Sequence, residues 1–210
     1  MTSVDIRTDE QIVEELRTSF TPPDTKPREQ LHARLAERAE LADLLDVAYR
    51  TIDSPFGPIL LAATPAGLVR VAFEREDHVA VLSQLATDIS PRILLAPRRL
   101  DAAATQLAEY FAGHLRMFEL PLDLQLARGF RRSVLDHLRD IPYGSTESYA
   151  TVAGAAGKPA AIRAAASACS HNPLPVVVPC HRVVRSDGTI GQYLGGTEAK
   201  QALLTMEAAA

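Results

Sequence analysis

The spacing of apolar residues changes twice along the chain, near residues 49 and 126. Over residues 1–48, apolar side chains recur every three to four positions, which predicts one helix over 9–20 and a second over 27–47. The run Thr21-Pro22-Pro23-Asp24 separates them, because proline cannot continue a helix. We expect an acidic helical extension that packs on the neighbouring domain, with a partner-binding arm as the alternative.

Residues 49–125 show the apolar alternation of β-strands. Strands are predicted over 49–53, 59–63 and 67–73, and the turn Ser54-Pro55-Phe56-Gly57-Pro58 separates the first two. These strands are expected to form an antiparallel meander. Helices are predicted over 77–87 and 98–114, so this part of the chain is interpreted as an N-terminal α/β domain.

From residue 126 the pattern is helical again. An apolar stripe runs from Phe130 to Leu138 and ends at the turn Ile141-Pro142-Tyr143-Gly144. Helices over 148–156 and 160–170 flank the breaker Gly157-Lys158-Pro159, which is the layout of a helix-turn-helix. The predicted fold class is therefore α+β: an N-terminal antiparallel sheet with helices, then a mostly helical domain over 126–210.

The predicted helix over 160–170 is rich in alanine and carries one long polar side chain, Arg163. Small side chains allow a helix backbone to approach a surface closely, and Arg163 would then enter the groove that the helix covers. The alternative is that the alanines only favour the helix and close helix packing.

Charge is distributed unevenly along the chain. The net charge is −4, but residues 1–48 carry 6 basic against 11 acidic residues, residues 49–127 carry 7 against 9, and residues 128–210 carry 9 against 6. The C-terminal excess of +3 is weakly compatible with a polyanionic partner. No apolar run approaches the roughly 18–20 residues of a membrane span. No signal-peptide pattern opens the chain, and two cysteines cannot form a disulfide framework, so we expect a cytoplasmic protein that does not bind membranes.

The sequence Pro179-Cys180-His181-Arg182 is the main candidate for chemistry. It follows the apolar run Val176-Val177-Val178, which predicts a buried strand that ends beside the thiol. A thiol reacts as its thiolate, and a neighbouring imidazole is a base that can generate it. The alternative is a buried free cysteine that behaves as a small hydrophobic residue.

Together with the helix-turn-helix, Asn172 and the run Gly191-Gln192-Tyr193-Leu194-Gly195-Gly196, this motif resembles the O6-alkylguanine-DNA alkyltransferases. The resemblance covers about residues 49–207 and is strongest over 141–207. It implies a ribonuclease H-like N-terminal domain and a helix-turn-helix that binds the minor groove of double-stranded DNA. The implied reaction is irreversible transfer of an alkyl group from O6 of a flipped guanine to the protein's own cysteine, once per molecule and with no cofactor. A monomer is expected, with the thiol accessible to the extruded base.

The resemblance also implies roles for individual residues. Among the catalytic residues, Cys180 would be the alkyl acceptor, His181 the base acting through a water, Glu207 the carboxylate that orients His181, and Asn172 the brace of the preceding turn. The implied substrate- and DNA-binding residues are Tyr149, Arg163, Pro175, Val183, Tyr193, Gly195 and Gly196. Tyr149 would rotate the nucleotide and donate a hydrogen bond to the guanine, and Arg163 would fill the vacated space in the base stack.

The sequence departs from the family pattern at a few positions. Leu194 stands where serine is common, Ala166 and Ser167 where glycines often appear, and Ala127-Arg128-Gly129-Phe130 replaces the usual entry to the C-terminal half. The larger Leu194 side chain is expected to alter which alkyl groups fit.

The same residues allow four other interpretations. The first is a zinc site of Cys169, His171, Cys180 and His181. It is disfavoured, because Cys180 and His181 are adjacent, and adjacent side chains on an extended segment point to opposite sides. No metal site is therefore expected. In the family that the chain resembles, non-catalytic readers of alkylated bases carry tryptophan in place of Cys180, and this chain contains no tryptophan. A cysteine hydrolase and a helix-turn-helix regulator remain as weaker alternatives.

Overall fold

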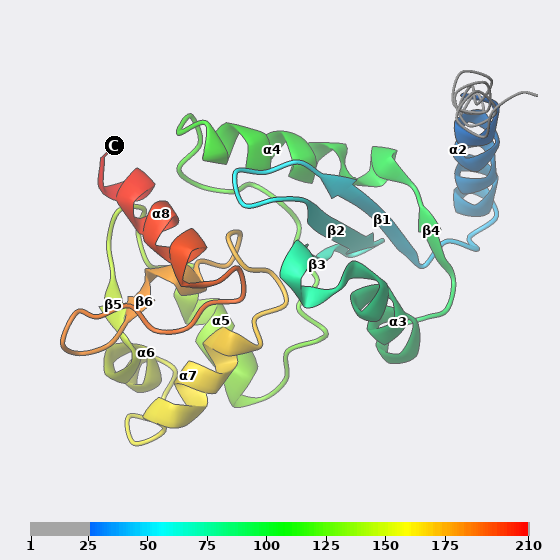
Figure 1. Ribbon diagram of the computed structural model, residues 1–210. Coiled ribbons are helices and arrows are strands. Elements are labelled where there is room, and N and C mark those ends of the chain that lie inside the picture. The colour runs from blue at the N-terminus through cyan, green and yellow to red at the C-terminus, as the bar shows by residue number, and fades with distance from the viewer. Residues whose placement is uncertain (1–25, 210) are drawn as a thin grey trace, which may run out of the picture.

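The computed structural model describes residues 26–209, and its N-terminal half is built on one four-stranded sheet (Figure 1). The strands are β1 (Val47–Ile52), β2 (Ile59–Thr64), β3 (Gly67–Phe73) and β4 (Ile93–Leu95), in the order β3-β2-β1-β4. The antiparallel meander of the first three strands is confirmed. The short strand β4, which pairs parallel to β1, was not predicted, because its three residues are too few to show a period.

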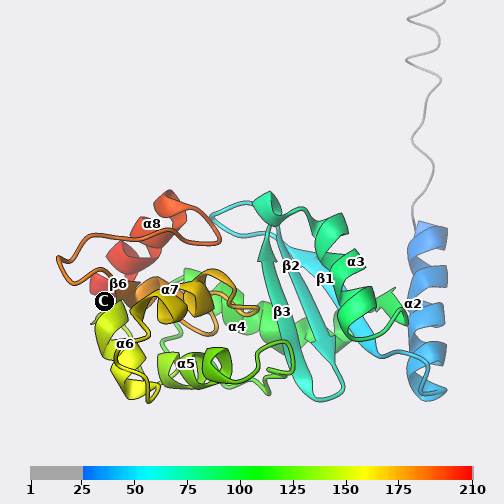
Figure 2. The same ribbon diagram turned by 90° about the horizontal axis from the view of Figure 1, so that it is seen from below.

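Helices cover both faces of this sheet. The apolar side chains of β1 to β3 alternate between two clusters, one shared with α3 (His78–Asp88) and the other with α4 (Asp101–Phe111). Figures 1 and 2 show these two helices on opposite sides of the strands. Because β2 has a helix on each face, all of its residues are buried. Two short 3₁₀ helices complete this half, η1 (Glu74–Glu76) and η2 (Pro97–Leu100).

The C-terminal half is mostly helical, as predicted. It contains α5 (Phe130–Leu138), α6 (Tyr149–Ala155), α7 (Ile162–Ser170), η3 (Cys180–Arg182) and α8 (Thr197–Ala208), with β5 (Glu147–Ser148) paired to β6 (Val183–Val184). The helix-turn-helix is formed by α6 and α7, whose ends lie within two residues of the prediction. Ser148 caps α6, because its hydroxyl accepts from the amide of Thr151 at 3.0 Å.

The two halves share one apolar core. A single cluster of buried side chains contains Phe73 and Tyr110 from the N-terminal half and Leu135, Leu138 and Tyr193 from the C-terminal half. The backbone also connects them, since the amide of Val71 in edge strand β3 donates to the carbonyl of Pro173 at 2.8 Å. The segment after α7 is therefore fixed against the sheet.

One predicted helix of the N-terminal extension is longer than the helix observed. The expected helix over 27–47 is α2 (Lys26–Leu41) and ends earlier, because Val47 begins β1. The helix predicted over 9–20 lies outside the described residues. Within the described part, no helix is long and apolar enough to cross a membrane.

The strand predicted at Val176–Val178 is wrong. Residues 173–179 form turns instead, and Val176 has a φ of +73°, which a β-branched residue rarely adopts. Pro173, Pro175 and Pro179 lack the amide protons that a strand needs for pairing. Burial of this apolar run therefore reflects a tight turn inside the core.

Candidate active site

The turn before Cys180 is held by a single side chain, Asn172. Its Oδ1 accepts from the amide of Leu174 at 3.0 Å, and its Nδ2 donates to the carbonyl of Val178 at 2.8 Å. The same Nδ2 also donates to Sγ of Cys180 at 3.1 Å. Asn172 has no exposed surface. It therefore joins the two ends of the turn and positions the thiol.

We expected the Cys180 thiol to be accessible to the extruded base. It is instead covered, with only 2% of the residue exposed. Burial raises its pKa to about 11, against the opposing effects of the hydrogen bond from Asn172 and the positive charge of Lys200. In this closed arrangement the sulfur is a protonated thiol at neutral pH. Thiolate formation requires a base or a change in the cover.

The base next in sequence is His181, which has no exposed surface and pairs with Glu207 of α8. Nε2 of His181 lies 2.9 Å from Oε1 of Glu207. Nδ1 is buried and has no hydrogen-bond partner within the described residues. Burial lowers the pKa of His181, which favours the neutral ring. A neutral ring protonated at Nε2 leaves a lone pair on Nδ1, as a general base requires.

Glu207 is charged although it is buried near the end of α8. It accepts from Arg182 Nε at 3.0 Å and Nη2 at 2.9 Å, and from the amide of Gly144 at 3.2 Å. Burial opposes ionisation, but the hydrogen bonds from His181 and Arg182 outweigh it and lower the pKa of Glu207 to about 2. The carboxylate is therefore a fixed negative charge behind the histidine.

Tyr149 lies against the loop 191–196, and Tyr193 is part of that loop. Burial and the nearby cysteines raise the pKa of Tyr149 to about 12, so its hydroxyl keeps the proton and is a hydrogen-bond donor. A Cβ on Gly191 would lie 2.7 Å from that hydroxyl, which means that the loop backbone rests on Tyr149. The ring of Tyr193 meets the ring of His181 edge-on, with centroids 6.2 Å apart.

Two glycines of the same loop pack against the N-terminal half. A Cβ on Gly195 would lie 2.8 Å from the Phe73 ring, and one on Gly196 would lie 2.5 Å from the Arg75 guanidinium. Gly196 also has a φ of +92°, in the region that favours glycine. This loop, whose Tyr193, Gly195 and Gly196 the family resemblance assigned to substrate and DNA binding, is therefore supported by β3 and η1.

The remaining predicted residues are spread around this centre. Pro175 is buried in the turn before the thiol, and the carbonyl of Val183 accepts from Nζ of Lys200 at 2.5 Å. Arg163 is exposed on α7, within the helix-turn-helix. The four predicted catalytic residues therefore form two hydrogen-bonded pairs, Cys180 with Asn172 and His181 with Glu207. Arg163, predicted to bind DNA, is exposed and available to an external partner.

Sequence reasoning gave no role to three residues of this centre: Lys200, Arg182 and Tyr110. Lys200 is wholly buried, and its Nζ lies 6.0 Å from the centre of the Tyr149 ring. Lys200, Leu203 and Glu207 recur at helical spacing on the buried face of α8. That pattern was visible in the sequence, because charged residues on an apolar stripe indicate buried polar partners.

The residues of the alternative zinc site do not converge. His171 is exposed at the end of α7, and its Nδ1 lies 2.8 Å from the carbonyl of Ser167. The reason given for disfavouring that site was wrong, since Cys180 and His181 lie in a 3₁₀ turn rather than an extended segment. In residues 26–209, no three or more His, Cys, Asp and Glu side chains are grouped to hold a metal ion.

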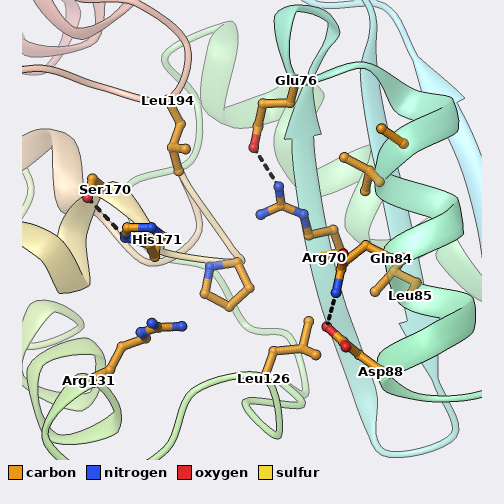
Figure 3. Close-up of a pocket in the computed structure, with 13 residues that line it drawn as sticks. Arg70, Glu76, Gln84, Leu85, Asp88, Leu126, Arg131, Ser170, His171 and Leu194 are labelled. Atoms are coloured by element: carbon orange, nitrogen blue, oxygen red, sulfur yellow. Dashed lines mark hydrogen bonds and ion pairs between the residues drawn. The ribbon is translucent and has the colours of Figure 1, made fainter.

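A cavity of about 440 Å³ lies between the two halves, next to this centre but separate from Cys180 and His181 (Figure 3). Arg70 and Gln84 border it on the side of the sheet and α3, and Arg131 and His171 border it on the helical side. Leu194 of the 191–196 loop reaches its rim.

Comparisons with known proteins agree with this geometry. Residues 47–124 match the family described as 6-O-methylguanine DNA methyltransferase, ribonuclease-like domain, and residues 129–209 match its DNA binding domain. The methylated-DNA–protein-cysteine methyltransferase of Mycobacterium tuberculosis is 38% identical over 161 residues, covering 77% of this chain and 92% of the relative. The constitutive enzyme of that name from Bacillus subtilis is 36% identical over 163 residues, covering 76% of this chain and 94% of the relative.

Solved structures give the same result. The crystal structure of the M. tuberculosis protein in complex with DNA has a TM-score of 0.67 and 37% identity, and the match covers 77% of this chain and 93% of that one. The α+β class and its ribonuclease-like first half are thereby confirmed. The chain belongs to the 6-O-methylguanine DNA methyltransferase family, the methylated-DNA–protein-cysteine methyltransferases.

Proposed function

We propose that this protein repairs DNA by direct reversal, with Cys180 as the acceptor of an alkyl group from O6 of guanine. The observation that carries the assignment is the pairing of a buried thiol with Asn172, next to a His181–Glu207 pair, in a member of this family. The same arrangement supports His181 as the base and Glu207 as the group that orients it.

The reaction is a displacement at the alkyl carbon. His181 Nδ1 takes the proton of Cys180 through a bridging water, and the orphaned, buried Nδ1 is the atom that such a water would satisfy. The sulfur–carbon bond forms as the carbon–O6 bond breaks, and guanine leaves with the electron pair. Tyr149, which retains its proton, donates a hydrogen bond to the departing base. The thioether on Cys180 is stable, so each molecule reacts once and needs no cofactor.

The DNA partner is proposed to lie across the helix-turn-helix. Arg163 is exposed on α7, and the C-terminal half carries the basic excess of +3, from 9 basic and 6 acidic residues. We propose that α7 enters the minor groove of the duplex and that Arg163 fills the gap left by the extruded alkylated guanine. A monomer suffices for this, because every proposed group comes from one chain.

Access to the thiol then requires movement. Cys180 is 2% exposed, and the loop 191–196 rests on Tyr149 with Tyr193 beside His181. We propose that this loop moves outward when a base enters, with Pro175 and the carbonyl of Val183 as the opposite wall. Bringing Val183 into contact with a base would require Lys200 to share or release its hydrogen bond.

The division into residues 1–48, 49–125 and 126–210 stays a prediction. In this scheme the last part binds DNA and carries out the transfer, and the middle part supports it. The acidic extension has no assigned task.

The test of the function uses the two cysteines as a matched pair. Wild type, Cys180→Ser and Cys169→Ser are each incubated with duplex DNA containing O6-methylguanine, and the peptides are analysed by mass spectrometry. We expect one added methylene on the Cys180 peptide in wild type and Cys169→Ser, and none in Cys180→Ser. Label on Cys169, or several substrate equivalents consumed per protein, would refute the proposal.

A further inference from the structure

Tyr110, on α4 of the N-terminal half, reaches the pair formed by His181 and Glu207. Its hydroxyl donates to Oε1 of Glu207 at 2.5 Å, and the hydroxyl oxygen lies 3.3 Å from Nε2 of His181. The partners are 97 and 71 residues away in the sequence. Tyr110 has no exposed surface. The reaction described above gives this hydroxyl no task.

The position of the hydroxyl is fixed by neighbouring rings. The Tyr110 ring contacts Phe111, Phe118 and Tyr143, with centroids 5.6, 5.1 and 6.1 Å away. A buried ring with two torsions and three aromatic neighbours has one available orientation. The hydroxyl is therefore preorganised, and the groups it meets must adapt to it.

The distances define where the protons are. Glu207 is ionised and can only accept, so Tyr110 must be the donor between them. Burial and the charge of Glu207 raise the pKa of Tyr110, which keeps this proton in place. The oxygen of Tyr110 can then only offer a lone pair to Nε2 of His181. With the carboxylate at 2.9 Å and the phenol oxygen at 3.3 Å, Nε2 faces two acceptors.

We propose that Tyr110 is a positioning residue of the alkyl-transfer site: its hydroxyl locks the Glu207 carboxylate and holds the His181 proton on Nε2, leaving Nδ1 as the base. This inference rests on the proposed function. Because Tyr110 belongs to α4, the N-terminal half would also take part in the reaction by positioning His181 and Glu207. The proton transfer itself remains between Cys180, the water and Nδ1.

Other charged or titratable groups also surround His181, and the variant proposed below leaves them unchanged. They are Glu207 and Lys200 of α8, Arg182 of η3, Cys180, and Tyr193 of the 191–196 loop. Removing the Tyr110 hydroxyl takes away a donor that withdraws charge from Glu207. The carboxylate then stabilises protonated His181 better, so the pH at which the base becomes neutral rises.

The test is Tyr110→Phe, with Tyr143→Phe as the matched control. Tyr143 contacts the same ring cluster, and its hydroxyl has no hydrogen-bond partner within the described residues. Single-turnover methyl transfer is measured against pH. For Tyr110→Phe we expect the plateau rate to fall about tenfold, as for loss of a hydrogen bond to a charged group. We also expect the acid limb to shift to higher pH, while Tyr143→Phe matches wild type in both.

A second readout does not depend on activity. Two-bond proton–nitrogen NMR correlations of ¹⁵N-histidine protein report which ring nitrogen carries the proton. We expect the Nε2-protonated tautomer for His181 in wild type and a mixture in Tyr110→Phe. An unchanged rate and pH profile in Tyr110→Phe would overturn the proposal, as would Nδ1 protonation in wild type. Equal losses in both variants, with no shift in pH profile, would reduce Tyr110 to a packing role.

These outcomes are distinct from failure of the proposed function. If wild type transfers no methyl group to Cys180, the function itself is wrong, whatever the tautomer of His181. If wild type and Tyr143→Phe transfer normally, the function stands and only the role of Tyr110 is being decided.

Discussion

Asn172 offers the sharpest test of how the turn before Cys180 is held, by the substitution Asn172→Ala. The variant leaves the amide of Leu174 without its partner, whereas the carbonyl of Val178 keeps its hydrogen bond from the amide of Cys180 at 2.8 Å; both groups lie in buried residues. An unsatisfied buried polar group costs about 1–3 kcal/mol and the loss of one further hydrogen bond about 1 kcal/mol, so the variant should lose about 2–4 kcal/mol. Domains of this kind have only about 5–15 kcal/mol to lose.

Gln106 provides a matched control. Its amide also bridges two backbone groups, because it accepts from the amide of Glu119 at 2.8 Å and donates to the carbonyl of Glu119 at 3.1 Å. These bonds are on the surface, where water replaces the lost partner. Gln106→Ala is therefore expected to cost less than about 1 kcal/mol. Each variant deletes two hydrogen bonds to backbone groups, and Asn172→Ala also deletes the bond to Sγ of Cys180, so the difference measures burial together with that third bond.

The assay is urea unfolding of the wild type and both variants, followed by thiol alkylation with iodoacetamide across pH in a Cys169→Ser background. The hydrogen bond from Asn172 lowers the pKa of Cys180, so its loss should raise that pKa and slow alkylation at a given pH. Equal losses of stability in Asn172→Ala and Gln106→Ala would refute the reasoning. Unchanged thiol reactivity in a folded Asn172→Ala would refute the electrostatic part alone.

Two further predictions follow from the loop 191–196 and from α7. Gly195→Ala should lose about 1–3 kcal/mol, since the new Cβ meets the buried Phe73 ring at 2.8 Å. Gly154→Ala in α6 has no atom within 4 Å and should be neutral or stabilising by up to about 1 kcal/mol; urea unfolding of both variants checks this, and equal stabilities would contradict it. Arg163→Ala should slow repair of duplex DNA at least about tenfold while leaving the reaction with free O6-benzylguanine unchanged, because only the duplex needs its stack filled. Equal losses on both substrates, measured by single-turnover rates, would exclude an intercalating role.

Elements with a clear local period could be predicted from the sequence. The alternation over 67–73 and the apolar stripe of residues 130–138 match β3 and α5 closely. The helix-turn-helix was found because Gly157 and Pro159 interrupt two helical patterns. Each of these signals depends on neighbours within about ten residues. Strand β4 has only three residues, and its place in the sheet depends on a parallel contact with β1, so no local pattern indicated it.

The candidate site was predictable only in part, because local patterns do not show contacts between residues that are far apart in the sequence. The run Pro179–Arg182 and Asn172 are close in sequence and were found together. The turn that joins them was read as a strand, because three consecutive valines favour strands and the effect of Val176 at positive φ is not visible in composition. Tyr110 lies within the helix predicted over 98–114, but nothing local indicates that its hydroxyl reaches Glu207.

Tyr110 and Gly195 connect the candidate site in the C-terminal half to the N-terminal half. The His181–Glu207 pair receives a hydrogen bond from Tyr110 of α4, and the loop 191–196, which contains Tyr193, rests on Phe73 at the end of β3. A displacement of the sheet relative to α8 would therefore change both the orientation of His181 and the support of the loop. Because the two halves also share one apolar core, the N-terminal half is better understood as a structural part of the reaction centre than as a separate appendage. Its removal should abolish transfer even if α5 to α8 stay folded.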